Sequence, residues 1–162
     1  LEQAFSSPLA AGIALIVTAI LMFLAERISL NLGDARDITL VDALIMGLMQ
    51  SLALFPGISR SGSTISGGMM RHLKRESAAK FSFFLAVPIM LAAGGLSTYQ
   101  MFTEVSDLGA FLPLMAVGFL TAMVVGYIAI RWLLRFLVNH TLTTFSIYCT
   151  LLGGATILVW FL

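Results

Sequence analysis

The chain has 162 residues, of which 59% are hydrophobic and only 10% charged, and its formal net charge is +1. Soluble domains carry about 25% charged residues, so this chain lacks the polar surface that would cover it in water. The composition excludes a soluble globular domain and predicts an all-α integral membrane protein that forms a single transmembrane unit over residues 1–162.

Four stretches are long and apolar enough to span a bilayer, which takes about 20 mainly apolar residues in a helix. In chain order they cover residues 5–25, 78–101, 111–134 and 142–162. The segment between the first two, residues 39–70, is different. Its apolar part, residues 41–55, is too short to span comfortably, and it breaks at Pro56-Gly57 into a run rich in serine and glycine. Irregular backbone at membrane depth is tolerated only where it is buried in protein or lines a cavity, so residues 39–70 are predicted to form a re-entrant helix–loop–helix.

The placement of basic residues supports this topology, because cytoplasmic loops are enriched in Lys and Arg. With a re-entrant segment, eight basic residues fall on one side of the membrane: Arg27, Arg36, Arg71, Lys74, Arg75, Lys80, Arg131 and Arg135. The opposite side then holds acidic residues and no basic ones. If the segment crossed the membrane instead, this asymmetry would collapse. The basic side is therefore predicted to be cytoplasmic and the C-terminus to lie outside.

Some polar and small residues receive structural interpretations. Gly118, Ala122 and Gly126 recur every four residues and form a flat stripe that another helix can approach closely. Glu26 and Asp42 lie close to the predicted helix ends, and interfacial placement explains both.

The run around Arg60 carries the chemistry. An arginine near the bilayer centre costs about 2.5–3.5 kcal/mol on insertion scales, so it must face a cavity and a counter-charge. Its guanidinium presents a rigid fork of donors that matches phosphate or carboxylate oxygens. A helix beginning near Ser63 would aim its free N–H groups and positive dipole end at the same point. Hydroxyl groups and glycines surround the arginine: Gly57, Ser59, Ser61, Gly62, Ser63, Thr64, Ser66, Gly67 and Gly68. Together these features predict an anion site, and a phosphate fits it best.

This pattern leaves three classes of function open. A diphosphate-lipid phosphatase is the leading hypothesis. A polyprenyl-phosphate transporter or flippase half is the alternative, because discontinuous helices also build transporter sites at the midplane. In a non-catalytic scaffold, the arginine would pair with a carboxylate and merely lock helices together.

The sequence QSLALFPGISRSGSTISGG at residues 50–68 closely resembles the signature of the bacterial undecaprenyl-diphosphate phosphatases, also called bacitracin-resistance proteins. The later strings AKFSFFLAVP at residues 79–88 and AVGF at residues 116–119 are similar to further segments of that family. The resemblance covers nearly the whole chain.

The resemblance implies a multi-pass enzyme of the bacterial plasma (inner) membrane. Such an enzyme hydrolyses undecaprenyl diphosphate to the monophosphate, which recycles the lipid carrier of peptidoglycan synthesis and confers bacitracin resistance. Family members are built from two inverted halves, and this chain is expected to be the C-terminal half only. The first-half motif, a Glu-rich segment with a Pro-x-Ser-Ser-x-Gly-His stretch, is absent. Any divalent cation, Mg²⁺ or Ca²⁺, is therefore expected to take its ligands from the N-terminal half, with no metal ligand in this half, and the fragment alone is expected to be inactive.

Carried over to this chain, the resemblance gives roles to individual residues. Arg60 would clamp the diphosphate oxygens, and Thr64 would be a hydroxyl ligand beside it. Ser59 would be a nucleophile or a phosphate ligand, and the second is favoured because a serine nucleophile needs a neighbouring base that this loop lacks. The cradle would be completed by Gly57, Ser61, Gly62, Ser63 and Ser66. Expected partners are the polyprenyl diphosphate lipid, the membrane, the N-terminal half and a second copy in a homodimer; no nucleic acid is expected.

Overall fold

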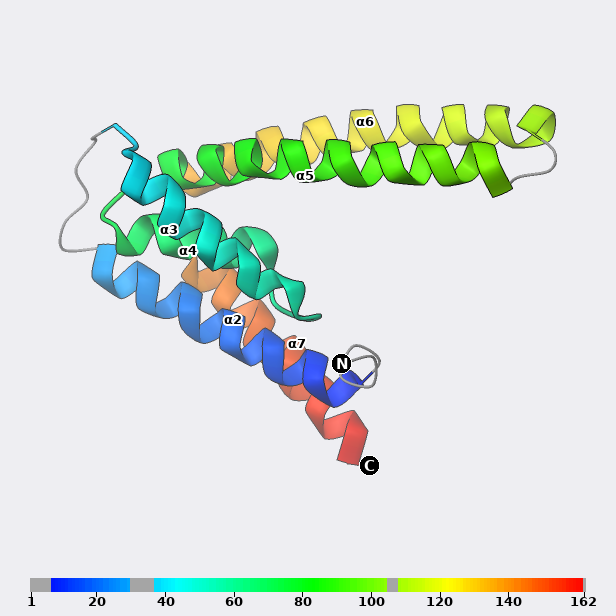
Figure 1. The fold of residues 1–162 in the computed structure, drawn as a ribbon. Helices are drawn as coiled ribbons and strands as arrows, with labels where there is room; N and C mark the ends of the chain where they lie inside the picture. The colour runs from blue at the N-terminus through cyan, green and yellow to red at the C-terminus, as the bar shows by residue number, and fades with distance from the viewer. Residues whose placement is uncertain (1–6, 30–36, 105–107, 162) are drawn as a thin grey trace.

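The computed structural model describes residues 7–29, 37–104 and 108–161, and every regular element in these ranges is a helix (Figure 1). In chain order the elements are α2 (Pro8–Ser29), α3 (Leu40–Ser51), the short 3₁₀ helix η1 (Leu52–Leu54), α4 (Arg60–Met70), α5 (Arg75–Glu104), α6 (Leu108–Asn139) and α7 (Thr143–Phe161). Helices α2, α5, α6 and α7 contain stretches long and apolar enough to cross a membrane. The all-α prediction is confirmed, and the four predicted spans fall on these four helices.

The observed helices extend beyond the predicted spans. Helix α5 starts three residues before the predicted residue 78, at Arg75, and α6 continues five residues beyond the predicted residue 134, to Asn139. Hydropathy identifies only the apolar part of a helix, but helical backbone hydrogen bonding can continue past that part. Residues 5, 6 and 162 of the predicted spans lie outside the described ranges.

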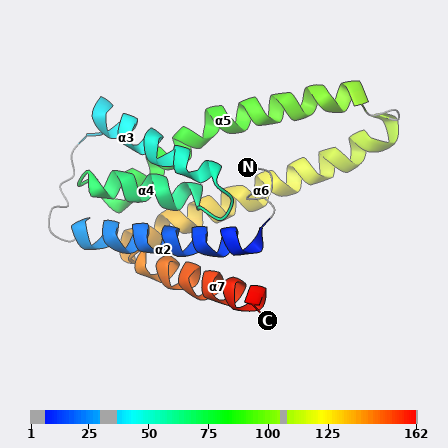
Figure 2. The same cartoon turned by 60° about the horizontal axis from the view of Figure 1, so that its bottom comes forward.

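Helices α2 and α7 run antiparallel side by side in both views (Figures 1 and 2). Their backbones approach closely at a pair of glycines: a Cβ atom on Gly153 would lie 2.8 Å from the carbonyl oxygen of Gly12. By contrast, no described atom beyond the neighbouring backbone of α6 itself lies within 4 Å of a Cβ position on Gly118 or Gly126. The small-residue stripe on α6 therefore receives no helix from the described part of the chain, and the close approach occurs on α2 and α7 instead.

Helices α3 and α4 form a hairpin at the centre of the molecule. Helix α4 packs against α2, α3 and α5, and its residues 62–69 are all buried. Met46 of α3 and Met69 of α4 lie in the core cluster with Ala78 of α5. Helix α4 is followed by His72, whose positive φ of 66° lets the Leu73 N–H donate to the Gly68 carbonyl at 3.1 Å.

Two buried carboxylates join five helix ends at one end of the molecule. Asp42 at the start of α3 accepts from Arg71 Nε after α4 at 3.1 Å. Glu26 near the end of α2 pairs with Arg75 at the start of α5 and accepts the Leu142 N–H, just before α7, at 3.1 Å. The chain therefore enters and leaves the α3–α4 hairpin on the same side.

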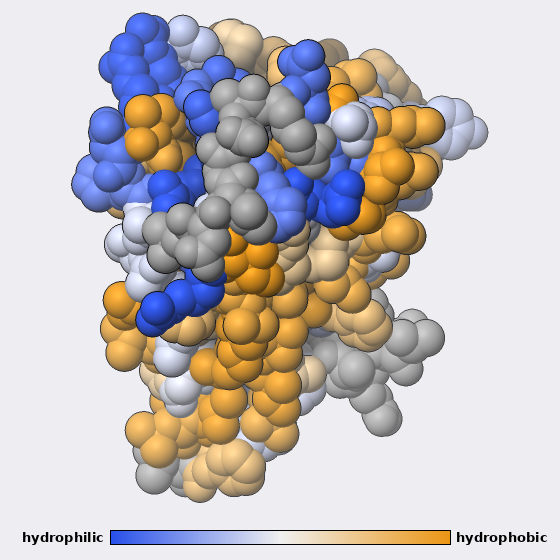
Figure 3. All heavy atoms as spheres, turned by 90° about the vertical axis from the view of Figure 1, so that its left-hand side faces the viewer, coloured by the Kyte–Doolittle hydropathy of each residue, from blue (hydrophilic) through white to orange (hydrophobic). Residues whose placement is uncertain are grey.

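The residues at this end bear on two expectations. Glu26 and Asp42 lie near helix ends, as expected, but they are only 3% and 0% exposed and form ion pairs with residues from distant parts of the chain. Hydrophilic side chains gather in the upper part of the face shown in Figure 3, above an apolar surface. Arg27, Arg71 and Arg75 lie at this end of the molecule, and Arg36 lies outside the described ranges, so the predicted charge asymmetry across the membrane stays a prediction.

Candidate functional site

The candidate site is the tip of the α3–α4 hairpin. At the opposite end of the hairpin, α3 begins with an N-terminal cap. Thr39 Oγ1 accepts the Asp42 N–H at 3.3 Å, and Asp42 Oδ2 accepts the Thr39 N–H at 3.0 Å, which is a capping box. Because Asp42 also binds Arg71, one carboxylate starts α3 and joins it to the end of α4. The two arms of the hairpin are thereby held in register, and the tip is the point most distant from this cap.

The tip is anchored to α2. Gly57 has a φ of +94°, and a Cβ atom there would lie 2.5 Å from the carbonyl oxygen of Ala11, so only glycine fits this contact. The Ser59 N–H donates to Thr18 Oγ1 at 3.1 Å, while Thr18 itself donates to the Ala14 carbonyl at 3.0 Å. These contacts fix where α4 begins. Thr18 was not predicted as a site residue, although it is one of the few polar residues in an apolar helix.

Ser59 is the N-cap of α4, and its Oγ accepts the Gly62 N–H at 3.1 Å. The helix therefore begins at Arg60 rather than near Ser63 as predicted, because the cap lies four residues earlier. The Ser59 hydroxyl keeps its own proton for a second partner. Thr64 Oγ1 donates to the Arg60 carbonyl at 2.7 Å and is fully buried.

Arg60 itself is half-buried in the first turn of α4. Within residues 7–29, 37–104 and 108–161, no carboxylate forms an ion pair with it. It lines a groove of about 610 Å³ bounded by α5 and α6, together with Lys80. Its guanidinium is therefore free of any described carboxylate and open to an anion.

The other predicted site residues lie in two further environments. Ser59, Ser61 and Gly62 line a separate cavity of about 180 Å³ beside α7. Ser63 and Ser66 are fully buried, and their hydroxyl oxygens have no hydrogen-bond partner in the described structure. The tip thus brings Ser59, Arg60, Ser61 and Gly62 together in one helical turn, whereas Ser63, Thr64 and Ser66 lie deeper in the protein.

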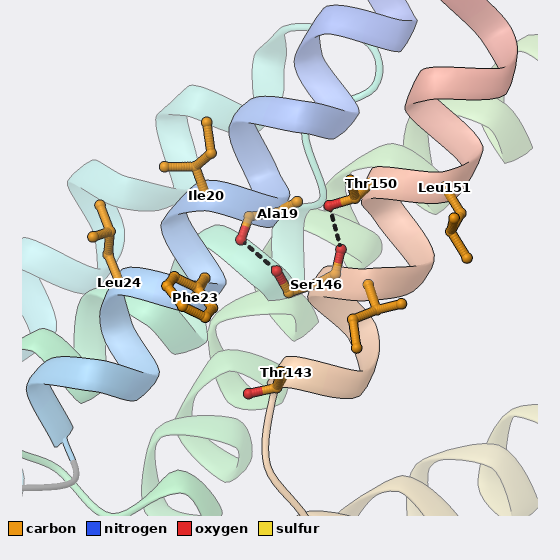
Figure 4. A pocket seen from close by; sticks show the side chains of 9 residues that line it. Ala19, Ile20, Phe23, Leu24, Thr143, Ser146, Thr150 and Leu151 are labelled. Carbon is orange, nitrogen blue, oxygen red and sulfur yellow. Dashed lines mark hydrogen bonds between the residues drawn. The ribbon is translucent and has the colours of Figure 1, made fainter.

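A third cavity lies on the outer side of α2 and α7 (Figure 4), with a volume of about 490 Å³. Ile20, Phe23 and Leu24 form its wall on α2. Its buried hydroxyl is already used, because Ser146 Oγ donates to the Ala19 carbonyl at 2.7 Å. The cavity holds no charged side chain, so it offers no site for an anion.

The described residues offer little to a cation. They contain no group of three His, Cys, Asp or Glu side chains arranged to hold a metal ion. The tip presents a guanidinium and hydroxyl groups without a carboxylate, and this donor set suits an anion rather than Mg²⁺ or Ca²⁺, which take oxygen ligands rich in carboxylates.

The fold defines a multi-pass membrane protein, and the tip of its α3–α4 hairpin presents an arginine and hydroxyl groups. The family model described as "Bacitracin resistance protein BacA" matches residues 1–155. The chain belongs to this family.

Several curated relatives carry the name undecaprenyl-diphosphatase. The one from Corynebacterium glutamicum is 46% identical over 134 residues, which are 83% of this chain and 46% of the relative. Those from Carboxydothermus hydrogenoformans and Methanosphaera stadtmanae are 42% and 37% identical over 159 residues, 98% of this chain and 60% and 56% of the relatives. The chain spans about half the length of these relatives. Its placement in the C-terminal half stays a prediction.

Proposed function

We propose that the whole protein hydrolyses undecaprenyl diphosphate to undecaprenyl phosphate in the bacterial plasma membrane, and that this chain supplies the phosphate-binding part of the site. The relatives' name supports the reaction. The observation that carries the proposal is Arg60: a half-buried guanidinium in the first turn of α4 with no carboxylate partner in the described ranges. Recycling of the lipid carrier and bacitracin resistance follow from this reaction.

The proposal includes a re-entrant hairpin with its tip near the bilayer midplane. Helix α3 has 12 residues and is about 18 Å long, shorter than the hydrocarbon core of about 30 Å. The tip binds Thr18, which lies halfway along the 22-residue α2, about 15 Å from its start. The basic end of the molecule would then face the cytoplasm. The inverted repeat of the family would supply a second hairpin from the rest of the protein.

In this arrangement Arg60 donates to two non-bridging oxygens of the diphosphate and stabilises the charge that develops on the transferred phosphoryl group. Ser59 donates its hydroxyl proton to a phosphate oxygen while its lone pair caps α4. We assign Ser59 to phosphate binding rather than nucleophilic attack, because no base in the described ranges hydrogen-bonds its hydroxyl. The base that activates water, and the carboxylates that hold Mg²⁺ or Ca²⁺, would come from the rest of the protein.

The test is phosphate release from undecaprenyl diphosphate by the full-length protein. Arg60→Ala is expected to lower kcat by about 10³-fold or more, the scale that an arginine finger contributes in other phosphoryl-transfer enzymes. Arg60→Lys is expected to recover little, because an ammonium lacks the fork. Arg131→Ala is the matched control, since Arg131 is exposed and, among the described residues, hydrogen-bonds only Tyr127.

Undiminished hydrolysis by both Arg60 variants would remove Arg60 from the mechanism. Movement of the lipid between leaflets with no release of phosphate would instead favour the transporter alternative.

A further inference from the structure

Thr18 of α2 contacts both ends of the first turn of α4. Its Oγ1 accepts the Ser59 N–H at 3.1 Å, and a Cβ atom on Gly62 would lie 3.2 Å from its Cγ2. Ser59 and Gly62 are also the two residues that the N-terminal cap of α4 joins, with 3.1 Å between the Gly62 nitrogen and Ser59 Oγ. Arg60 lies between them, so the two branches of one side chain hold the turn that carries the guanidinium.

The orientation of the Thr18 hydroxyl is determined by a second hydrogen bond. Thr18 is fully buried, and its Oγ1 donates to the Ala14 carbonyl at 3.0 Å, which uses its only proton. The oxygen therefore presents a lone pair to the Ser59 N–H. Valine at this position would keep the methyl contact with Gly62 and lose the acceptor, whereas serine would keep the acceptor and lose the methyl group.

This contact bears on which residue begins α4. Helices α2 and α4 pack against each other, and the Ser59 N–H is bound to a hydroxyl on α2, so Ser59 has a fixed position relative to α2. Ser61 is an alternative N-cap two residues later, because serine is favoured at that position. A start at Ser61 would leave Arg60 outside the helix. Thr18 therefore favours the start that places Arg60 in the first turn.

We propose that Thr18 is a positioning residue, which acts through Arg60 and Ser59 without touching the substrate. The inference rests on the proposed function, which supplies a diphosphate as the ligand of Arg60. A guanidinium that binds two oxygens of one group must be placed accurately, and an error of about 1 Å in a catalytic group can cost about 100-fold in rate. The role assigns part of the phosphate site to α2, outside the serine-rich hairpin.

The test compares Thr18→Val, Thr18→Ser and Thr121→Val in the full-length protein. Thr121 is the matched control, because its hydroxyl also donates to the carbonyl four residues earlier, at 2.8 Å, but lies on an exposed part of α6. One measurement is kcat for phosphate release from undecaprenyl diphosphate. The other is the affinity and stoichiometry of inorganic diphosphate, measured by titration calorimetry.

Thr18→Val is expected to lower kcat by about 10-fold to 100-fold, because Arg60 loses its placement. The same variant is expected to bind inorganic diphosphate about tenfold more weakly at unchanged stoichiometry, the scale of one lost hydrogen bond to a charged group. Thr18→Ser is expected to recover most of both losses, and Thr121→Val to match the wild type. Thr18→Ala removes the same hydroxyl with a smaller side chain and is expected to behave like Thr18→Val, so the test does not depend on one variant folding.

Unchanged kcat and affinity in Thr18→Val and Thr18→Ala would overturn the proposal, and so would a loss in Thr18→Ser as large as in Thr18→Val. A lower stoichiometry at unchanged affinity would mean that Thr18 only supports the fold, which also overturns it. These results leave the phosphatase proposal standing if the wild type releases phosphate. If the wild type releases none but binds inorganic diphosphate, and Thr18→Val weakens that binding, the phosphatase proposal fails and the role of Thr18 is supported.

Discussion

In the two helical hairpins of this chain, hydrophobicity and burial are related in opposite ways. In the α3–α4 hairpin, helix α4 is rich in serine and glycine, and yet its residues 62–69 are all buried. In the α5–α6 hairpin, α6 is strongly apolar, and yet side chains such as Leu114 and Phe119 are 70% and 69% exposed. In a bilayer, apolar side chains are as stable against lipid as against protein, so small and polar residues mark the contacts between helices. In this chain, apolar sequence therefore identifies the surface of the described structure, and the polar, glycine-rich sequence of α4 identifies its interior.

The largest expected difference in stability comes from one glycine-to-alanine substitution in each hairpin. Gly57→Ala is expected to lower the free energy of unfolding by about 3 kcal/mol, because the new Cβ clashes with Ala11 and the φ of +94° strains any other residue. Gly118→Ala on α6 meets no described atom within 4 Å beyond the neighbouring backbone of α6 itself and is expected to be neutral or stabilising by up to about 1 kcal/mol. Denaturant unfolding of both variants in detergent measures the difference. Equal effects would mean that the two hairpins do not differ in packing as described.

A second comparison removes one carboxylate from each hairpin. Asp42→Asn is expected to cost about 2–3 kcal/mol of stability, because Asp42 is fully buried, caps α3 and pairs with Arg71. Glu76→Gln on α5 breaks an exposed pair with Lys80 and is expected to cost less than about 0.5 kcal/mol. The same unfolding measurement applies to both. A loss at Glu76 as large as that at Asp42 would contradict the contrast between the interior and the surface.

The smallest expected change in stability tests the role of the buried hydroxyl groups. Ser63→Ala removes a fully buried hydroxyl that has no described hydrogen-bond partner, so stability is expected to rise by up to about 1 kcal/mol. Thr64→Val is the control, since it removes a hydroxyl that donates to the Arg60 carbonyl and is expected to cost about 1 kcal/mol. Parallel assays of phosphate release show whether Ser63 also contributes to the cradle. A clear loss of stability in Ser63→Ala would mean that its hydroxyl has a partner in the whole protein.

The sequence was sufficient for most of the fold because local signals determine it. The four spans follow from apolar length alone, and Pro56-Gly57 marks the break between α3 and α4. The start of α4 was placed three residues too late, since any of several serines can serve as an N-cap and only the contact with Thr18 selects Ser59.

Long-range pairings in and around the candidate site were beyond sequence reasoning. The role of Arg60 in anion binding was predicted from the cost of burying its charge, which can be judged from the local sequence. The pairs of Asp42 with Arg71 and of Glu26 with Arg75 join residues 29 and 49 positions apart, and no local pattern specifies them. The division of the predicted cradle among a groove, a cavity and the protein interior likewise depends on how α5, α6 and α7 pack around α4.

Glu26 has a consequence for the order in which the molecule is made. Its carboxylate is synthesised with α2, but its partners, Arg75 and the Leu142 N–H, are not synthesised until 49 and 116 residues later. A carboxylate without partners is too costly to bury, so Glu26 cannot take its buried position until those residues have been made. The ends of α2, α5 and α7 therefore close around it late in biogenesis, after α7 has begun to emerge.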